Sequence, residues 1–111
     1  MRPYEVMIIF DVGLEEEVVQ AGIDRFTELI RSRHGEPGQV DRWGKRRFAY
    51  ELDHRWEGEY VVVQFQADPP AVAELDRALF LADEVIRHKV IRLPDRVAAR
   101  ALPAGATGGG G

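Results

Sequence analysis

Apolar and polar residues alternate in four short segments of this chain and follow a helical period in two others. The alternating segments predict β-strands, because successive side chains of a strand point to opposite faces. These segments lie at Pro3–Asp11, Gln39–Leu52, Glu59–Ala67 and Glu84–Leu93. Gly44 predicts a bend or bulge inside the second strand, since glycine within a strand often marks one.

The two helical segments follow the first and third strands. The first helix is predicted between Gly13 and His34, with three glutamates at its start, where the helix dipole favours negative charge. The second begins at Asp68-Pro69-Pro70, because proline is tolerated in the first turn of a helix. The predicted apolar stripes comprise Leu14, Val18, Val19, Ile23, Phe26 and Ile30 in the first helix, and Val72, Leu75, Ala78, Leu79 and Ala82 in the second.

The resulting order is β-α-β-β-α-β, in which each helix connects two strands. This order predicts an α+β, ferredoxin-like fold whose four-stranded antiparallel sheet has the strand order four, one, three, two. Right-handed crossovers place both helices on one face of the sheet, so the other face is left open. The folded domain is predicted to span residues 1–93, followed by a flexible tail rich in alanine and glycine at 94–111.

Composition limits the classes of protein to consider. A chain of 111 residues can bury one two-layer core, and its formal net charge is -4. It contains no cysteine, which excludes disulfides, thiolate chemistry and cysteine-ligated metals. No apolar run has membrane-spanning length and the start lacks the apolar core of a signal peptide, so a cytoplasmic location is expected. The negative balance argues against coating nucleic acid by bulk charge but not against a local basic patch.

The strongest local signal is Trp43-Gly44-Lys45-Arg46-Arg47-Phe48-Ala49-Tyr50, where three cations stand side by side in an acidic protein. Adjacent like charges repel one another, so such a cluster favours a nearby anionic surface, and a nucleic-acid backbone is the leading candidate. The alternative is a solvated strand edge, where lysine and arginine discourage pairing between sheets. Taken alone, these residues leave the two interpretations balanced.

Other basic residues fall before the first strand and on the last one. The predicted sheet order makes the second and fourth strands its edges, so we expect the cations to flank the sheet, where they suit contacts to phosphate. The centre of the open face is predicted to hold Met7, Ile9, Tyr60 and Val62, and this apolar character favours a protein partner. The cations in question are Arg2, Lys45, Arg46, Arg47, Arg87, Lys89 and Arg92.

The five phenylalanines are assigned mostly to core faces. They are Phe10, Phe26, Phe48, Phe65 and Phe80. Base stacking of the kind found in RNA-recognition motifs is not expected on the third strand. Glu57 stands where that motif needs a basic residue, and its paired aromatics are missing.

Little in the chain supports an enzyme, a metal site or a cofactor site. His34, His54 and His88 lie far apart, and none forms a spaced ligand pair on a helix. His88 is predicted on the inward face of an edge strand, where a partly buried structural histidine is the commoner case. No glycine-rich phosphate loop or recognisable carboxylate pair is present, so no cofactor is expected.

Five segments, taken together, carry a resemblance to a known family. They are Met1-Arg2-Pro3-Tyr4-Glu5, the Trp43–Tyr50 segment, Gly58-Glu59-Tyr60-Val61-Val62, Leu75-Asp76-Arg77 and the Val85–Arg92 segment. Each is weak alone, but in this order and at these spacings they are specific. Through them the chain resembles the bacterial small-subunit ribosomal protein S six family over roughly Met1 to Leu93.

The resemblance implies the ferredoxin-like fold and a non-enzymatic role in the small ribosomal subunit. Members of that family bind the central domain of small-subunit ribosomal RNA together with ribosomal protein S eighteen, so the same partners are implied here. By this analogy the cations named above are the candidate contacts to RNA or to the protein partner. The family pattern leads us to expect a smaller or uncharged side chain at the position of His88, so this residue departs from it. The tail after Arg96 need not follow the family pattern.

Two alternatives on the same fold belong to other functional classes, namely an acylphosphatase-like enzyme and a ligand-sensing regulatory module. An acylphosphatase needs an anion-cradling loop with a positioned arginine after the first strand. The corresponding segment, Asp11-Val12-Gly13-Leu14-Glu15-Glu16, is acidic and would repel phosphate. A regulatory module normally accompanies an enzyme domain, for which this chain has no room.

Overall fold

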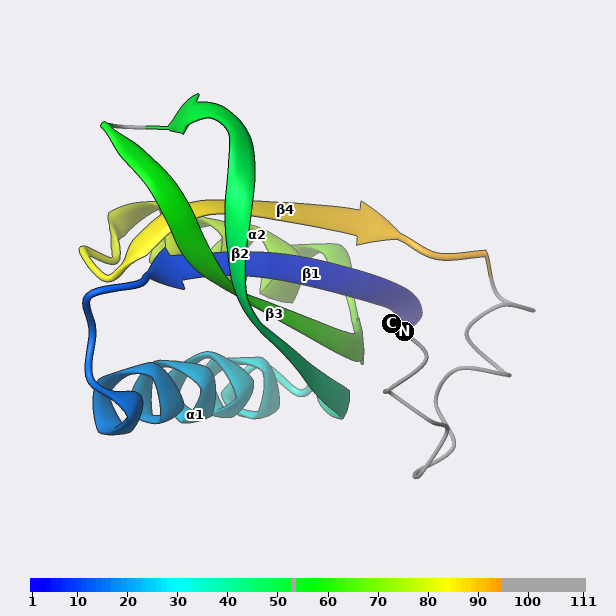
Figure 1. The fold of residues 1–111 in the computed structure, drawn as a ribbon. Helices are drawn as coiled ribbons and strands as arrows, with labels where there is room; N and C mark the ends of the chain where they lie inside the picture. Colours follow the sequence, from blue (N-terminus) through cyan, green and yellow to red (C-terminus); the bar gives the residue numbers. More distant parts are fainter. Residues whose placement is uncertain (53, 95–111) are drawn as a thin grey trace.

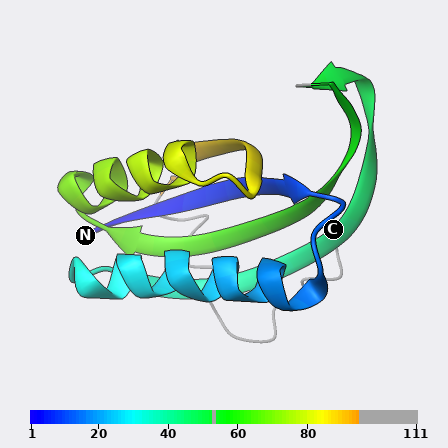
Figure 2. The same ribbon diagram turned by 90° about the vertical axis from the view of Figure 1, so that its left-hand side faces the viewer.

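The computed structural model describes residues 1–52 and 54–94. The elements are strand β1 (Arg2–Asp11), helix α1 (Glu16–Ser32), strands β2 (Glu36–Leu52) and β3 (Arg55–Ala67), helix α2 (Pro69–Leu81) and strand β4 (Val85–Arg92). The strands form one sheet in the order β2-β3-β1-β4, and both helices lie against the same face of it (Figure 1; Figure 2). The predicted fold class and sheet order are therefore confirmed, whereas the predicted tail beyond Pro94 lies outside the described residues.

The core lies between the sheet and the two helices. Alternate side chains of β1 and β3 point toward the helices, and a stripe on each helix faces them. Removing such a side chain from water stabilises the fold by roughly 1.5–3 kcal/mol. The fully packed cluster consists of Tyr4, Val6, Ile8, Phe10, Val19, Ile23, Phe26, Ile30, Val61, Val63, Phe65, Ala67, Ala71, Leu75 and Leu79.

Two residues that the sequence assigned to the core are exposed. Val18 on α1 is 43% exposed and Phe80 on α2 is 79% exposed. Each is the chain neighbour of a buried residue, Val19 or Leu79, and one step along an α-helix turns the side chain by about 100°. The predicted stripe of the first helix was therefore one residue too wide, and the assignment of Phe80 to a core face was wrong.

The β2–β3 hairpin is longer than predicted. The predicted third strand began at Glu59, but β3 already begins at Arg55, and Arg47 of β2 pairs with Glu57 of β3. The alternation of apolar and polar residues is absent here, because the tip of the hairpin is exposed on both faces and charged residues are tolerated on either one. β1 ends where Asp11 pairs with Gly58, so the hairpin reaches beyond the sheet, as both views show (Figure 1; Figure 2).

The start of β2 was also misplaced, since the strand begins at Glu36 and not at Gln39. Pro37 and Gly38 are typical of turns, so they gave no sign of a strand. Proline is nevertheless tolerated in β2, because β2 is an edge strand and the N–H groups on its free side need no partner. The predicted irregularity at Gly44 is confirmed. The pairing of β2 with β3 shifts between Arg42 and Gly44, and Gly44 has a φ of 86°.

Gly58 marks a close approach at the base of the hairpin. A Cβ atom at this position would collide with Cγ2 of Ile9 and would lie 2.8 Å from Cζ of Phe48. Phe48 therefore lies over the backbone of β3 on the face of the sheet away from the helices, and only glycine leaves room for it.

We predict that Gly58→Ala lowers the free energy of unfolding by about 1–3 kcal/mol, because the added methyl group overpacks the contact with Ile9 and Phe48. Urea unfolding measures the change. Gly13→Ala is the matched control, since a Cβ there meets only Asp11 Oδ1, at an ordinary 3.5 Å. Equal free energies of unfolding for the two variants would show that the close contact at Gly58 does not constrain the fold.

Candidate RNA-binding and partner-binding surface

Three of the candidate cations lie on β2 near the base of the hairpin, where all three are exposed; we call Lys45, Arg46 and Arg47 the hairpin cations. Arg46 pairs across the ladder with Gly58, and Lys45 and Arg47 pair with the residues on either side of it. Because side chains alternate along a strand, Arg46 shares the open face of the sheet, and its two neighbours point to the other side.

The cations of β4 divide in the same way. Arg87 pairs with Ile9 and Lys89 with Met7, so both share the open face. Arg92 pairs with the core residue Tyr4, so it lies on the helix side, where it borders a hollow between α2 and β4. Arg92 is thereby separated from Arg87 and Lys89.

The sheet register places the candidate cations at two opposite ends of the sheet. Gly58 and Asp11 pair at the end of β1, and the first residues of β4 lie beside the same end, so the hairpin cations and Arg87 flank it from opposite edges. At strand spacings of about 4.8 Å, the two edges of a four-stranded sheet are roughly 14 Å apart. Arg2, paired with Ala67, lies at the opposite end together with Arg92.

Ion pairing distinguishes most of these cations from five other arginines of the fold. In residues 1–52 and 54–94, no ion pair involves the hairpin cations, Arg2, Arg87 or Lys89. Their donors are therefore available to an external anion such as phosphate. The arginines paired with carboxylates are Arg25, Arg31, Arg33, Arg42 and Arg55.

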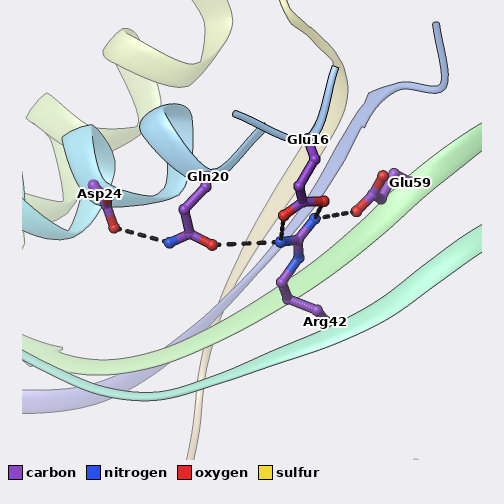
Figure 3. A network of polar contacts seen from close by, with 5 residues as sticks. All are labelled: Glu16, Gln20, Asp24, Arg42 and Glu59. Atoms are coloured by element: carbon purple, nitrogen blue, oxygen red, sulfur yellow. Dashed lines mark hydrogen bonds and ion pairs between the residues drawn. The ribbon is translucent and has the colours of Figure 1, made fainter. Parts of the chain in front are cut away.

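Arg42 is the β2 cation that the fold uses internally (Figure 3). Its guanidinium donates to both carboxylate oxygens of Glu16 on α1, at 2.9 Å from Nη2 to Oε1, and also to Glu59 on β3. Gln20 accepts a longer contact of 3.4 Å from Arg42 and donates to Asp24 at 3.0 Å. The network joins α1 to both strands at the base of the hairpin.

These contacts also shift the ionisation of the groups involved. The hydrogen bond from Arg42 lowers the pKa of the Glu16 carboxyl. The hydrogen bond to Glu16, reinforced by Glu59, raises the pKa of Arg42 despite its partial burial. Arg42 therefore stays charged and engaged, so it contributes to the position of the hairpin and not to the exposed cationic surface.

A second anchor holds the other strand of the hairpin. Nη2 of Arg55 lies 3.0 Å from Oδ2 of Asp11 at the end of β1. The other oxygen of this carboxylate accepts the N–H of Gly13 at 3.0 Å. The segment after β1 thus presents an engaged carboxylate in place of the anion-cradling loop that an acylphosphatase would require.

Aromatic side chains extend the apolar centre of the open face toward β2. Trp43 stacks on Tyr60, with ring centroids 6.3 Å apart and planes inclined by 1°, and Phe48 packs against Tyr60 at 6.2 Å. Ile9 and Val62, expected at this centre, are each only 6% exposed. Trp43 remains 39% exposed and is the outermost part of this aromatic group. Trp43 was not among the residues predicted on this face, because the bulge before Gly44 interrupts the alternation of side chains.

The side chain of His88 pairs with a residue of helix α2. Nε2 of His88 lies 2.8 Å from Oδ1 of Asp76 on α2, and its side chain is 13% exposed, which agrees with the predicted partly buried position. Across residues 1–52 and 54–94, no group of three or more histidine, cysteine or acidic side chains is placed to hold a metal ion. No helix in this part of the chain is long and apolar enough to cross a membrane.

Fold and surface together define a small ferredoxin-like domain whose exposed chemistry is that of an interaction surface. The family described as Ribosomal protein S6 matches residues 3–92. Small ribosomal subunit protein bS6 of Salinispora tropica is 50% identical over 92 residues, which cover 83% of this chain and 96% of that protein. The corresponding protein of Corynebacterium glutamicum is 47% identical over 93 residues, 84% of this chain and 98% of its own.

A solved structure agrees with these relatives. The crystal structure of 30S ribosomal protein S6 from Thermotoga maritima matches with a TM-score of 0.81 and 32% identity, over 88% of this chain and 92% of that one. The chain belongs to the ribosomal protein S six family. It is therefore a non-enzymatic structural protein of the small ribosomal subunit, as the resemblance implied, and its expected location at the cytoplasmic ribosome agrees with this. The acylphosphatase-like alternative is wrong.

We predict that Arg42→Met lowers the free energy of unfolding by about 1–2 kcal/mol, because Glu59, whose side chain is 13% exposed, loses its charged partner. Urea unfolding measures the loss. Arg31→Met serves as control, since its partner Glu28 is 69% exposed and such pairs contribute little. If Arg42→Met is no more destabilising than Arg31→Met, the network does not hold the hairpin.

A further ion pair gives the stability of the fold a dependence on pH. Nη2 of Arg25 on α1 lies 2.7 Å from Oε2 of Glu84, in the turn before β4, and the Glu84 side chain is 17% exposed. Burial alone would raise the pKa of Glu84, but hydrogen bonds from the backbone and from Arg25 outweigh it, so the pKa lies below 4.5. A carboxyl whose pKa is depressed on folding stabilises the folded state above its unfolded pKa and loses that contribution in acid.

We predict that the wild type loses stability on acidification below pH 4.5, and that Glu84→Gln loses less over the same interval, because the substituted side chain has no proton to gain. Chemical unfolding across a pH series tests the difference. Parallel curves for the two proteins would contradict a lowered pKa at Glu84.

Proposed function

We propose that this chain binds the central domain of small-subunit ribosomal RNA together with ribosomal protein S eighteen. The observation that carries the proposal concerns the two edges of a sheet whose open face is apolar: the hairpin cations on one edge, and Arg87 and Lys89 on the other, make no ion pair within the described residues. Membership in a family of small-subunit ribosomal proteins supports RNA as the anion.

The phosphate contacts are assigned first to the hairpin cations and Arg87. They flank one end of the sheet, and Arg42 and Arg55 hold the hairpin there through carboxylates of the fold. Cations already held in place lose less freedom on binding, and the bidentate geometry of arginine suits phosphate. Lys89, Arg2 and Arg92 are further candidate contacts, the last two from the opposite end of the sheet.

The protein partner is assigned to the open face. Trp43, Phe48 and Tyr60 form an aromatic group beside Ile9 and Val62, and Trp43 leaves part of its ring in solvent. Aromatic residues with nearby arginines are enriched where protein interfaces bind most strongly. An apolar centre between two cationic edges allows one face to meet a protein while its margins meet RNA.

The net charge gives a reason for cooperation between the two partners. At -4, the chain as a whole repels a polyanion, although its local cations attract one. A basic protein on the open face would offset that repulsion and extend the cationic surface. RNA affinity should therefore be low for the chain alone and higher for the pair.

Calorimetric titration of a central-domain RNA fragment, with and without S eighteen, tests the proposal. We predict tighter RNA binding with the partner, and a weaker salt dependence for Arg46→Gln/Arg47→Gln. Loss of two phosphate contacts lowers the slope of log K against log salt by roughly 1.4–1.8.

Arg31→Gln/Arg33→Gln is the matched control, because it changes the net charge equally at the other end of α1, where both arginines already have carboxylate partners. Its slope should equal that of the wild type. Equal RNA affinity with and without S eighteen would remove the cooperative part of the proposal. Equal slopes of log K against log salt for the two double variants would show that Arg46 and Arg47 do not contact the RNA phosphates.

A further inference from the structure

Phe80 has the largest exposed fraction of any large apolar side chain in residues 1–52 and 54–94, at 79%. It lies near the end of α2, on the helix layer, and so apart from the aromatic group of the open face. A phenyl ring left in water loses the stabilisation that burial would provide, so covering it by a contact outside the fold would be favourable.

The ring borders a hollow between the end of α2 and the free edge of β4. The hollow measures about 430 Å³ and is lined by Leu79, Phe80, Val85, Ile86, Arg87 and His88. Ligand pockets commonly measure about 300–1,000 Å³, so a single ring system fits here. Because β4 is an edge strand, Arg87 can border this hollow as well as the open face.

Two unpaired cations accompany the ring. Arg87 lines the hollow itself, and Arg77 precedes Phe80 by three residues, which places the two side chains next to each other on α2. Neither arginine makes an ion pair within the described residues. His88 is engaged by Asp76, and Asp83 in the following turn is a nearby opposing charge.

Two other hollows among the described residues lack this combination. One, beside the start of α2, contains Arg33 and Asp68, which pair with Glu74 and with the amino terminus. The other, between α2 and β4, contains Asp76, already paired with His88. Neither has an exposed phenylalanine, tyrosine or tryptophan among its lining residues.

We propose that Phe80, Arg77 and Arg87 form a subsite that stacks one unpaired RNA base on the phenyl ring and binds the flanking phosphates. Every base has a π-face, and an aromatic ring beside free arginines is the arrangement that binds single-stranded nucleic acid. A purely apolar protein contact would not require both cations. The inference rests on RNA binding by this chain but not on the identity of the RNA domain or of the protein partner.

Competition between wild type and variants for small ribosomal subunits stripped of this chain tests the subsite. Phe80→Leu keeps the apolar character but removes the π-face, and we expect about tenfold weaker incorporation, the size of one lost stack. Phe80→Tyr should stay within about twofold of the wild type because it retains the ring. Leu81→Ala is the control at the same helix end, since Leu81 is 64% exposed and should be neutral.

Chemical probing of the RNA in the same particles gives a second readout. One or two unpaired bases should become reactive with Phe80→Leu and stay protected with Phe80→Tyr and Leu81→Ala. Incorporation of Phe80→Leu equal to the wild type overturns the subsite. So does a pattern in which Phe80→Ala and Leu81→Ala weaken incorporation while Phe80→Leu does not, because that pattern marks an apolar protein contact. Protected bases outside the central domain would leave the subsite standing and contradict the RNA domain proposed above.

Discussion

The unbroken antiparallel pairing of β1 with β3 is the constraint on which the surface depends. It runs from Arg2 opposite Ala67 to Asp11 opposite Gly58, and a slip of one residue would turn every core side chain of one strand toward solvent. Burial of the core thereby fixes the position of Gly58, and Gly58 fixes the base of the hairpin. The site of the hairpin cations is thus set by residues that never reach the surface.

Charge is distributed over this frame in two ways. Arginines between layers are paired, as Arg42 is with α1 and β3, and Arg55 with the end of β1. At the margins of the sheet, the hairpin cations, Arg87 and Lys89 make no ion pair in the described part of the chain. Pairing within the fold stabilises the hairpin, and its absence at the margins leaves charge for a partner. A protein with a net charge of -4 can therefore present a basic rim.

Periodicity was sufficient for the fold class, the six elements and the sheet order, because burial on one face imposes a period that sequence displays. It failed where burial is weak. The tip of the hairpin is exposed on both faces, so Arg55 and Glu57 carry no alternation, and β3 was predicted too short. Phe80 was misassigned for a related reason, since an apolar residue next to a helix stripe cannot be distinguished from a member of it without the packing.

The amino-acid sequence by itself determined the secondary structure, the family and the cations at the sheet margins, all of which follow from local pattern and residue type. Only the tertiary structure decided which of those cations are free. Arg42 and Arg46 lie four positions apart on the same strand, and no local pattern distinguishes them. Glu16 and Glu59 nevertheless form ion pairs with Arg42 and not with Arg46. Ion pairs form between residues brought together by packing, across separations along the chain that no local pattern records.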